Sequence, residues 1–170
     1  IVDPNNANFG KLSAAVYSIY IVGRIDELSL ARAFYANLNQ TSEGVALGIT
    51  DNMSFSNFNK VEFYTNYFNS QIAEEPLVEG RYYLISCTAN NNGEKKFYIN
   101  GELLSETLGA TTYNDQPIVS IGTLDIGRDF LVGDIAEIKV YRGVDATVHA
   151  SETTTLMDKY QIDTSEPTDP

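Results

Sequence analysis

The sequence predicts an all-β fold, an antiparallel sandwich or barrel, on the basis of two observations. Segments rich in β-branched and aromatic residues recur at short intervals, and the connections between them, such as TANNNGE and ATTYNDQP, carry turn-forming residues. No segment of helical period separates these strands, which argues against a parallel α/β fold. The chain of 170 residues is long enough for one domain with a substantial core.

The expected strands follow one another along most of the chain. They cover residues 15–25, 31–38, 44–50, 60–68, 81–89, 95–106, 117–127 and 130–143. The segment 95–106 (KKFYINGELLSE) is expected to form a hairpin, since Asn100-Gly101 supplies the two positive φ angles that a type I′ turn needs. Phe97 and Ile99 then share one face of the sheet, and Tyr98 points to the other.

One short helix is expected near residues 150–160. Leu156 and Tyr160 are four residues apart and can share a face, and Ser151 is the expected N-cap, with Glu152 in the first turn. The tail TSEPTDP that follows is polar and typical of a linker. We therefore expect a sandwich domain over residues 1–163, cut from a longer protein with neighbouring domains, and a linker over residues 164–170.

Composition limits the function classes. The formal charge of −12 opposes binding to nucleic acid or insertion into an anionic membrane, because few Lys and Arg side chains are present to neutralise phosphates. No apolar run approaches the roughly 20 residues of a membrane-spanning helix. Cys87 is the single cysteine and lies in an apolar run, so we expect a buried, inert thiol. His149 is the single histidine, which argues against a His-based zinc cluster or a Ser-His-Asp triad.

The order of motifs in the second half of the chain resembles a known family. GRYYLISCTAN is followed by EKKFYINGELLSE, by FLVGDIAEIKVYRG and by the expected terminal helix. This succession resembles the laminin-G-like, concanavalin A-like jelly roll, which has an aromatic-led strand, a hairpin of the form lYvNG and a last strand of the form f.G.iDeiriY. The first half fits more loosely, through YSIYIVGRI and VALGITDN, and Ala136 stands where the family often has Asp.

The resemblance implies a two-sheet β-sandwich, and strand alternation then assigns each side chain to a face. The residues expected to face inward are Tyr83, Ile85, Cys87 and Ala89 on one strand, Phe97 and Ile99 in the hairpin, and Ala136, Ile138 and Val140 on the last strand. Those expected to face outward on the last strand are Glu137, Lys139 and Tyr141.

The family includes glycoside hydrolases, so catalysis has to be considered. Relatives of the laminarinase type carry acid residues at E-x-D-x-x-E spacing on one strand, because glycosidic cleavage needs two carboxylates about 5–9 Å apart. No such motif occurs in this sequence. The nearest cluster, Asp134 and Glu137, is three residues apart and is expected on opposite faces of a strand. We therefore expect no enzymatic activity.

Tyrosines at outward positions give a candidate glycan site. Tyr64, Tyr82 and Tyr98 alternate with inward residues on their strands, and Asn66 follows Tyr64. If these strands are adjacent, the rings form a platform on one outer face, on which a sugar can pack while Asn66 hydrogen-bonds its hydroxyl groups. The alternative is that they are ordinary half-buried strand residues, or that the N-terminal segment or the terminal helix covers that face.

Oxygen-bearing side chains in the expected loops give a candidate calcium site, and the resemblance implies a structural or ligand-bridging Ca²⁺. The candidates form three clusters, of which Asp3 and Asp134 are the preferred ligands: Asp3, Asn5 and Asn6; Asp51 and Asn52; and Asp125, Asp129 and Asp134. Ca²⁺ binds six to eight oxygens, which loops at a sandwich edge can supply. No D-x-D-x-D-G loop is present, however, and turn propensity alone also explains these residues.

Two functions from different classes remain. The first is a non-catalytic, lectin-like recognition module of a larger extracellular, cell-surface or virion-surface protein, which binds a glycan such as a cell-surface carbohydrate. The second is a structural or protein-interaction domain, a decoration or spacer of a surface appendage, without a small-molecule site. Clustered exposed tyrosines with nearby amides would favour the first function. A flat, charged outer face with edge strands paired to another chain would favour the second.

Overall fold

The structure is a computed structural model, and it describes ten stretches of the chain. They are residues 2–3, 17–28, 32–38, 44–49, 60–64, 70–90, 94–108, 119–125, 128–142 and 146–162. Every structural statement below concerns these residues.

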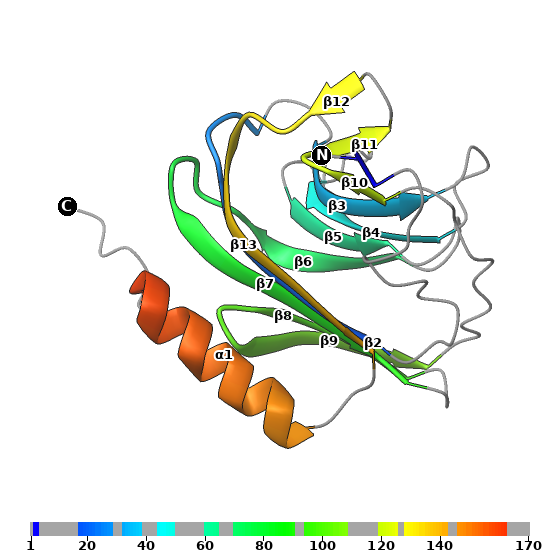
Figure 1. Cartoon of the computed structure of the whole chain (residues 1–170), viewed down its shortest axis with the longest axis vertical. Helices are drawn as coiled ribbons and strands as arrows, with labels where there is room; N and C mark the ends of the chain where they lie inside the picture. Colours follow the sequence, from blue (N-terminus) through cyan, green and yellow to red (C-terminus); the bar gives the residue numbers. More distant parts are fainter. Residues whose placement is uncertain are drawn as a thin grey trace.

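Two antiparallel sheets pack face to face, and one helix lies on the outer side of the second sheet (Figure 1). The first sheet has the order β1–β10–β3–β4–β5–β6, formed by Val2–Asp3, Val119–Ile121, Arg32–Leu38, Gly44–Ile49, Lys60–Tyr64 and Ser70–Pro76. The second has the order β13–β2–β7–β8–β9, formed by Gly133–Arg142, Tyr17–Ile25, Tyr82–Ala89, Glu94–Ile99 and Glu102–Leu108. Strands β11 (Thr123–Asp125) and β12 (Arg128–Phe130) form a separate ribbon. The expected two-sheet β-sandwich with a C-terminal helix is confirmed.

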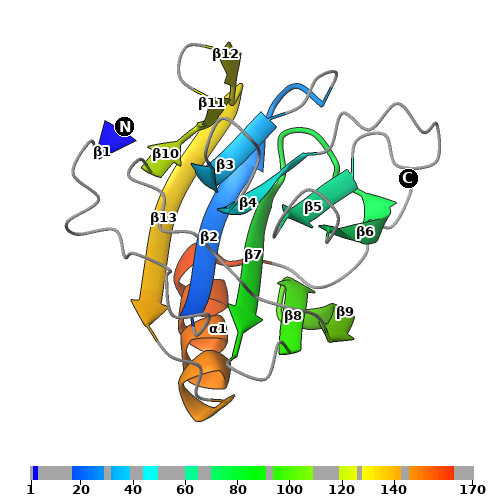
Figure 2. The ribbon, with the colours of Figure 1, turned by 90° about the vertical axis from the view of Figure 1, so that its right-hand side faces the viewer.

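The space between the sheets holds the main apolar core. In Figure 2, strands β3 and β4 of the six-stranded sheet lie in front of β2. The expected inward residues of β7 are all in this core: Tyr83, Ile85, Cys87 and Ala89. Phe97 of β8 is fully buried there, and Ile99 packs against the same cluster. Burial raises the pKa of the Cys87 thiol well above its usual range, as expected for an inert cysteine.

The β8–β9 hairpin forms as its sequence predicts. Asn100 and Gly101 have φ angles of 51° and 81°, so both central residues of the two-residue loop occupy the left-handed region. Asn100 also anchors the turn to β7, because its Oδ1 accepts a hydrogen bond from the Leu84 N–H at 3.0 Å and its own N–H donates to the Leu84 carbonyl at 2.7 Å.

The last strand, β13, corrects one expected face. Ala136 was expected inward but is exposed, because the pairing with β2 shifts between Ile135 and Glu137. This β-bulge adds one residue to β13, so that Ile135 packs against the core instead. Ile138 and Val140 also pack against the core. The outward positions of β13 are confirmed by contacts to the helix: Glu137 with Lys159 at 2.8 Å, Lys139 with Glu152 at 2.6 Å and Tyr141 with Glu152 at 2.9 Å.

Helix α1 spans Ala146–Tyr160 and starts earlier than expected. Ser151 lies inside the helix, so its predicted N-cap role is wrong. The earlier start adds a first turn whose His149 contacts the sheet at Tyr20. The predicted shared face of Leu156 and Tyr160 is confirmed, since Leu156 is buried and Tyr160 packs beside it. Among the described residues, no helix is long and apolar enough to cross a membrane.

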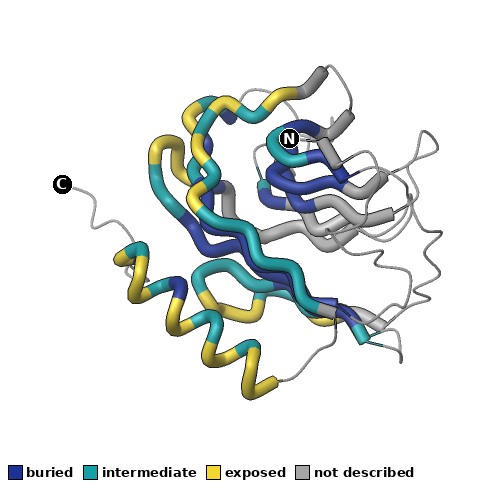
Figure 3. Tube along the Cα trace, in the orientation of Figure 1, coloured by how far each residue is buried: buried dark blue, intermediate teal, exposed yellow. Residues whose placement is uncertain are grey.

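Because α1 covers the outer face of the five-stranded sheet, that sheet has a second, smaller apolar cluster. Leu156 and Ile162 bury Tyr20, Val22 and Leu84 there. Strand β2 is consequently covered on both faces and is buried over nearly its whole length (Figure 3). This double coverage explains why YSIYIVGRI is almost continuously apolar rather than alternating.

Candidate functional site

The three tyrosines that were expected to face outward do not all lie on adjacent strands. Tyr64 belongs to β5 in the six-stranded sheet, whereas Tyr82 and Tyr98 belong to β7 and β8 in the five-stranded sheet. The expected three-ring platform is therefore wrong, because strands that resemble each other in sequence belong to opposite sheets. The side chain of Tyr64 and all of Asn66 lie outside the described part of the chain.

Tyr82 and Tyr98 share the outer face of one sheet but lie apart on it. Tyr98 is opposite Ser86, four residues along β7 from Tyr82, which is about 13 Å at strand spacing. Both side chains are half-buried, and the neighbour Tyr83 is in the core. The predicted strand parity is confirmed. The two outward tyrosines mark two separate places on the sheet.

At the Tyr82 end, the surface is an ionic cluster. The Arg24 guanidinium lies 2.7 Å from Asp134 and 2.9 Å from Asp26, and it stacks 5.4 Å from the centre of the Tyr82 ring. The Tyr82 hydroxyl donates a hydrogen bond to Asp134 at 3.2 Å. The Asp134 carboxylate is thus shared between a cation and a hydroxyl donor.

This arrangement bears on the calcium expectation. Arg24 pairs with the Asp134 carboxylate at 2.7 Å, so a Ca²⁺ at Asp134 would have to compete with the guanidinium. The side chain of Asp3 lies outside the described part of the chain. Within the described stretches, no group of three or more His, Cys, Asp and Glu side chains is arranged to hold a metal ion. A structural Ca²⁺ bound by loop acids, with Asp3 and Asp134 as preferred ligands, stays a prediction.

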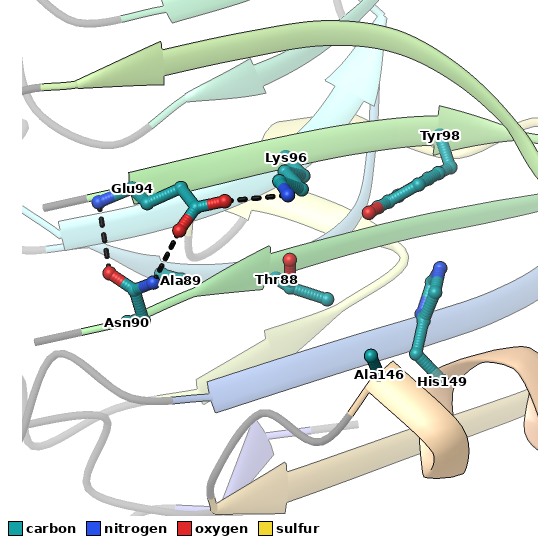
Figure 4. A pocket seen from close by; sticks show the side chains of 8 residues that line it. All are labelled: Thr88, Ala89, Asn90, Glu94, Lys96, Tyr98, Ala146 and His149. Carbon is teal, nitrogen blue, oxygen red and sulfur yellow. Dashed lines mark hydrogen bonds and ion pairs between the residues drawn. The ribbon is translucent and has the colours of Figure 1, made fainter. Parts of the chain in front are cut away.

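At the Tyr98 end, α1 and the sheet enclose a groove of about 300 Å³ (Figure 4). The end of β7, alternate residues of β8 and the first turn of α1 supply its walls. The side chains that line it are Thr88, Ala89, Asn90, Glu94, Lys96, Tyr98, Ala146 and His149. We call this the β7–β8–α1 groove.

One end of the groove is a fixed polar cluster. Glu94 Oε1 lies 2.5 Å from the Lys96 Nζ, and the Asn90 amide donates to Glu94 Oε2 at 2.7 Å. Asn90 is held in turn, because its Oδ1 accepts from the Glu94 N–H at 3.0 Å. The hydrogen bonds from Lys96 and Asn90 lower the pKa of the Glu94 carboxyl, and the bond to Glu94 raises the pKa of Lys96. Both groups are therefore charged at neutral pH.

The other end of the groove is aromatic. The Tyr98 and His149 rings pack with their centres 4.3 Å apart at an angle of 42°. The His149 Nδ1 forms a hydrogen bond with the Tyr20 hydroxyl at 2.9 Å, and this bond holds the imidazole ring in place. In Figure 4, Tyr98 and His149 lie across the groove from Glu94 and Asn90. The groove thus offers ring faces at one end and hydrogen-bonding groups at the other.

The environment of His149 leads to a prediction about pH. Burial, with a smaller contribution from Lys96, lowers the pKa of His149 below its ordinary value of 6.5. The folded state then binds this proton less readily than the unfolded state. The stability that His149 contributes is complete above pH 6.5 and is lost as the pH falls below 6.5 toward the folded-state pKa.

Because His149 is the single histidine, its ring protons give one NMR titration curve. We expect a midpoint below 6.5, and a His149→Gln variant should show a smaller loss of melting temperature between pH 7 and pH 5. A midpoint at or above 6.5 would contradict this account of the groove.

Sequence reasoning missed most of the groove. Glu94, Lys96 and Tyr98 occupy alternate positions of β8, so their shared outer face could have been found from EKKFY alone. The sequence predicts no contact for His149. Its place depends on how α1 docks on the sheet, for which the sequence carried no local signal.

Comparison with protein families gives one match, which covers most of the chain. The model of the "Concanavalin A-like lectin/glucanases superfamily" matches residues 6–145. A comparison with curated proteins gives no match.

Solved structures give many matches of low sequence identity. Botulinum neurotoxin type C, which depends on two ganglioside molecules to enter cells, matches with 18% identity and a TM-score of 0.59, over 83% of this chain and 36% of the toxin chain. A Bacteroides ovatus protein, provisionally assigned as carbohydrate-binding, matches with 16% identity and a TM-score of 0.62, over 82% and 40%. The binding domain of botulinum neurotoxin DC in complex with SialylT matches with 17% identity and a TM-score of 0.63, over 88% and 38%.

These solved chains share the fold of this protein. The chain spans about two fifths of their length or less. Each of the three is described as a binding protein or is reported with a bound or required sugar.

Proposed function

This chain belongs to the concanavalin A-like lectin/glucanases superfamily, and from that premise we propose that it is a non-catalytic, lectin-like recognition module that binds a glycan in the β7–β8–α1 groove. We place it in a larger extracellular, cell-surface or virion-surface protein. The similar solved structures support this, since they include ganglioside-dependent, SialylT-bound and carbohydrate-binding proteins.

One observation carries the proposal: a single groove combines paired ring faces with a fixed amide and carboxylate. Sugars present apolar C–H faces that pack on aromatic rings, and hydroxyl groups that need donors and acceptors. Tyr98 and His149 supply the rings, and Asn90 and Glu94 supply the polar atoms. Tyr98 was among the tyrosines that the sequence marked for glycan binding.

Two carboxylates of the described surface, Glu94 and Glu137, support a non-catalytic role. A glycosidase needs a general acid whose pKa is raised, beside a second carboxylate. Glu94 has a lowered pKa because Lys96 and Asn90 bind it, and Glu137 has a lowered pKa because Lys159 binds it. Both groups stay ionised at neutral pH and do not serve as proton donors.

The second candidate function is a structural or protein-interaction domain of a surface appendage. It is favoured by the coverage of the outer sheet face, where α1 buries Tyr20, Val22 and Leu84, and where Tyr82 is partly buried beside them. In that case the groove would be a feature of helix docking without a ligand. A binding experiment separates the two functions.

The test is a glycan-array screen followed by titration of the best hit with variants. Tyr98→Ala should weaken binding by about 1 kcal/mol or more, roughly fivefold to tenfold, because a packed aromatic contact is lost. Tyr160→Ala removes a half-buried tyrosine from the other end of α1 and should bind like the parent chain. Tyr82→Ala tests the sequence-predicted site at the ionic cluster.

Three results would count against the proposal. If no glycan binds at all, the interaction-domain function takes its place. If Tyr82→Ala abolishes binding and Tyr98→Ala does not, the site lies at the Arg24 cluster. Release of reducing sugar from a bound glycan would overturn the non-catalytic role.

A further inference from the structure

Resting on the proposed glycan-binding function, we propose that the β7–β8–α1 groove selects neutral sugars and rejects their carboxylate-bearing counterparts, such as uronic and sialic acids. The selectivity follows from the charges fixed around Lys96 and from the uncharged state of the aromatic end. One similar structure, a botulinum neurotoxin binding domain, is reported with SialylT, whereas we expect this groove to prefer neutral sugars.

Lys96 is the one cation among the side chains that line the groove, and two carboxylates already neutralise it. Its Nζ lies 2.5 Å from Glu94 and 3.7 Å from Glu106, which is opposite Lys96 on β9. The three groups together carry one net negative charge. A ligand carboxylate could bind Lys96 only by displacing Glu94 or by adding a third anion beside it.

The Glu94 carboxylate is held in place through both of its oxygens. Lys96 binds Oε1, Asn90 binds Oε2, and the Glu94 and Asn90 backbones and side chains bond each other reciprocally. A carboxylate has about four acceptor positions, so Glu94 can still accept hydrogen bonds from hydroxyl groups. Neutral sugars bring such hydroxyl donors, whereas an acidic sugar also brings a second carboxylate.

The aromatic end adds no positive charge at neutral pH. His149 is faced by Tyr20 from β2 and by Tyr98 from β8, with Lys96 further along β8. Its lowered pKa leaves the imidazole uncharged, so it presents a ring face and no anion-binding group. A sugar that packs on Tyr98 and His149 therefore meets an uncharged surface on one side and an excess carboxylate on the other.

The experiment compares neutral glycans with acidic glycans that share their core. Lactose is paired with 3′-sialyllactose, and methyl glucoside and methyl galactoside are paired with the corresponding methyl glucuronide and galacturonide. Binding is followed by saturation-transfer NMR at pH 7.5. We expect a neutral member to bind and its acidic counterpart to bind at least about fivefold more weakly. This is the order of the repulsion between two like charges about 4 Å apart in water.

Two variants separate electrostatic rejection from a steric one. Glu106→Gln removes a carboxylate beside Lys96 without changing a lining residue, so the neutral-to-acidic ratio should fall while neutral binding stays. Glu102→Gln makes the same charge change at an exposed position outside the groove and should leave the ratio higher than Glu106→Gln does. Raising the salt from 0.05 to about 0.5 M should also reduce the ratio by screening.

The outcomes distinguish this inference from the function on which it rests. If no glycan of either kind binds, the proposed function fails and the inference fails with it. If the acidic members bind as well as the neutral ones or better, the inference is overturned and the glycan-binding function stands. If the neutral preference is unchanged in Glu106→Gln and at high salt, rejection is steric and the electrostatic account is wrong.

Discussion

Replacing Gly133 with alanine should lower the free energy of unfolding by about 3 kcal/mol or more, the range of severe backbone conflicts in a folded core. The added Cβ would lie 2.0 Å from the Arg24 carbonyl oxygen, which belongs to the neighbouring backbone and cannot rotate away. Gly133 also has a φ of +154° at the start of β13, where it pairs with Ile25. Either β13 moves away from β2, or the first pairs of the ladder are lost.

Urea denaturation followed by tyrosine fluorescence measures this change, and Gly101→Ala is the matched control. Gly101 also has a positive φ, but the nearest obstacle to its Cβ is the Thr153 methyl group at 2.8 Å. That methyl lies at the end of a side chain that can turn, so the cost should be about 1–2 kcal/mol from backbone strain. Equal losses in the two variants would contradict the close approach at Arg24.

Replacing Phe97 with alanine should cost about 3–5 kcal/mol, because a fully buried ring leaves a void between the two sheets. The neighbouring Tyr98 lies on the opposite face of β8, half-exposed in the groove. Tyr98→Ala should cost about 1 kcal/mol, since solvent fills the space that its ring leaves. The pair thus separates a stability residue from a binding residue one position apart.

The same two variants should show opposite effects on function. Phe97→Ala should retain glycan binding at temperatures where it stays folded, whereas Tyr98→Ala should lose binding and stay folded. Circular dichroism and the glycan titration measure the two properties on the same samples. A larger stability loss in Tyr98→Ala than in Phe97→Ala would mean that the faces of β8 are reversed.

Features governed by neighbouring residues could be predicted from the sequence. The Asn100-Gly101 turn follows from the backbone freedom of two residues, and the parity of Tyr82 and Tyr83 follows from strand alternation. The order of motifs also gave the correct family. These features need no knowledge of which strands meet in space.

Features governed by distant contacts could not be predicted in the same way. Tyr64 lies in a strand as aromatic as that of Tyr82, yet hydrogen bonds place β5 and β7 in different sheets. The bulge that exposes Ala136 depends on pairing with β2 rather than on the β13 sequence. Strand β6 was also missed, since SQIAEEP is polar and owes its conformation to its pairing with β5.

The candidate site also has one part that neighbouring residues determine and one part that depends on distant contacts. The shared face of Glu94, Lys96 and Tyr98 could be predicted, because these residues alternate along one strand. The aromatic half needs His149, which reaches Tyr98 across more than 50 residues of chain because α1 folds back onto the sheet. A lone histidine in a polar segment gives no sequence signal for such a contact.

The docking of α1 also determines where this domain can be cut. The family match ends at residue 145, one residue before the helix begins. An expression clone trimmed to that match would uncover Tyr20, Val22 and Leu84 as a contiguous apolar area on the back of the sheet. Such an area promotes self-association. The residues that cover this area extend to Ile162. The helix should therefore be expressed together with the sandwich.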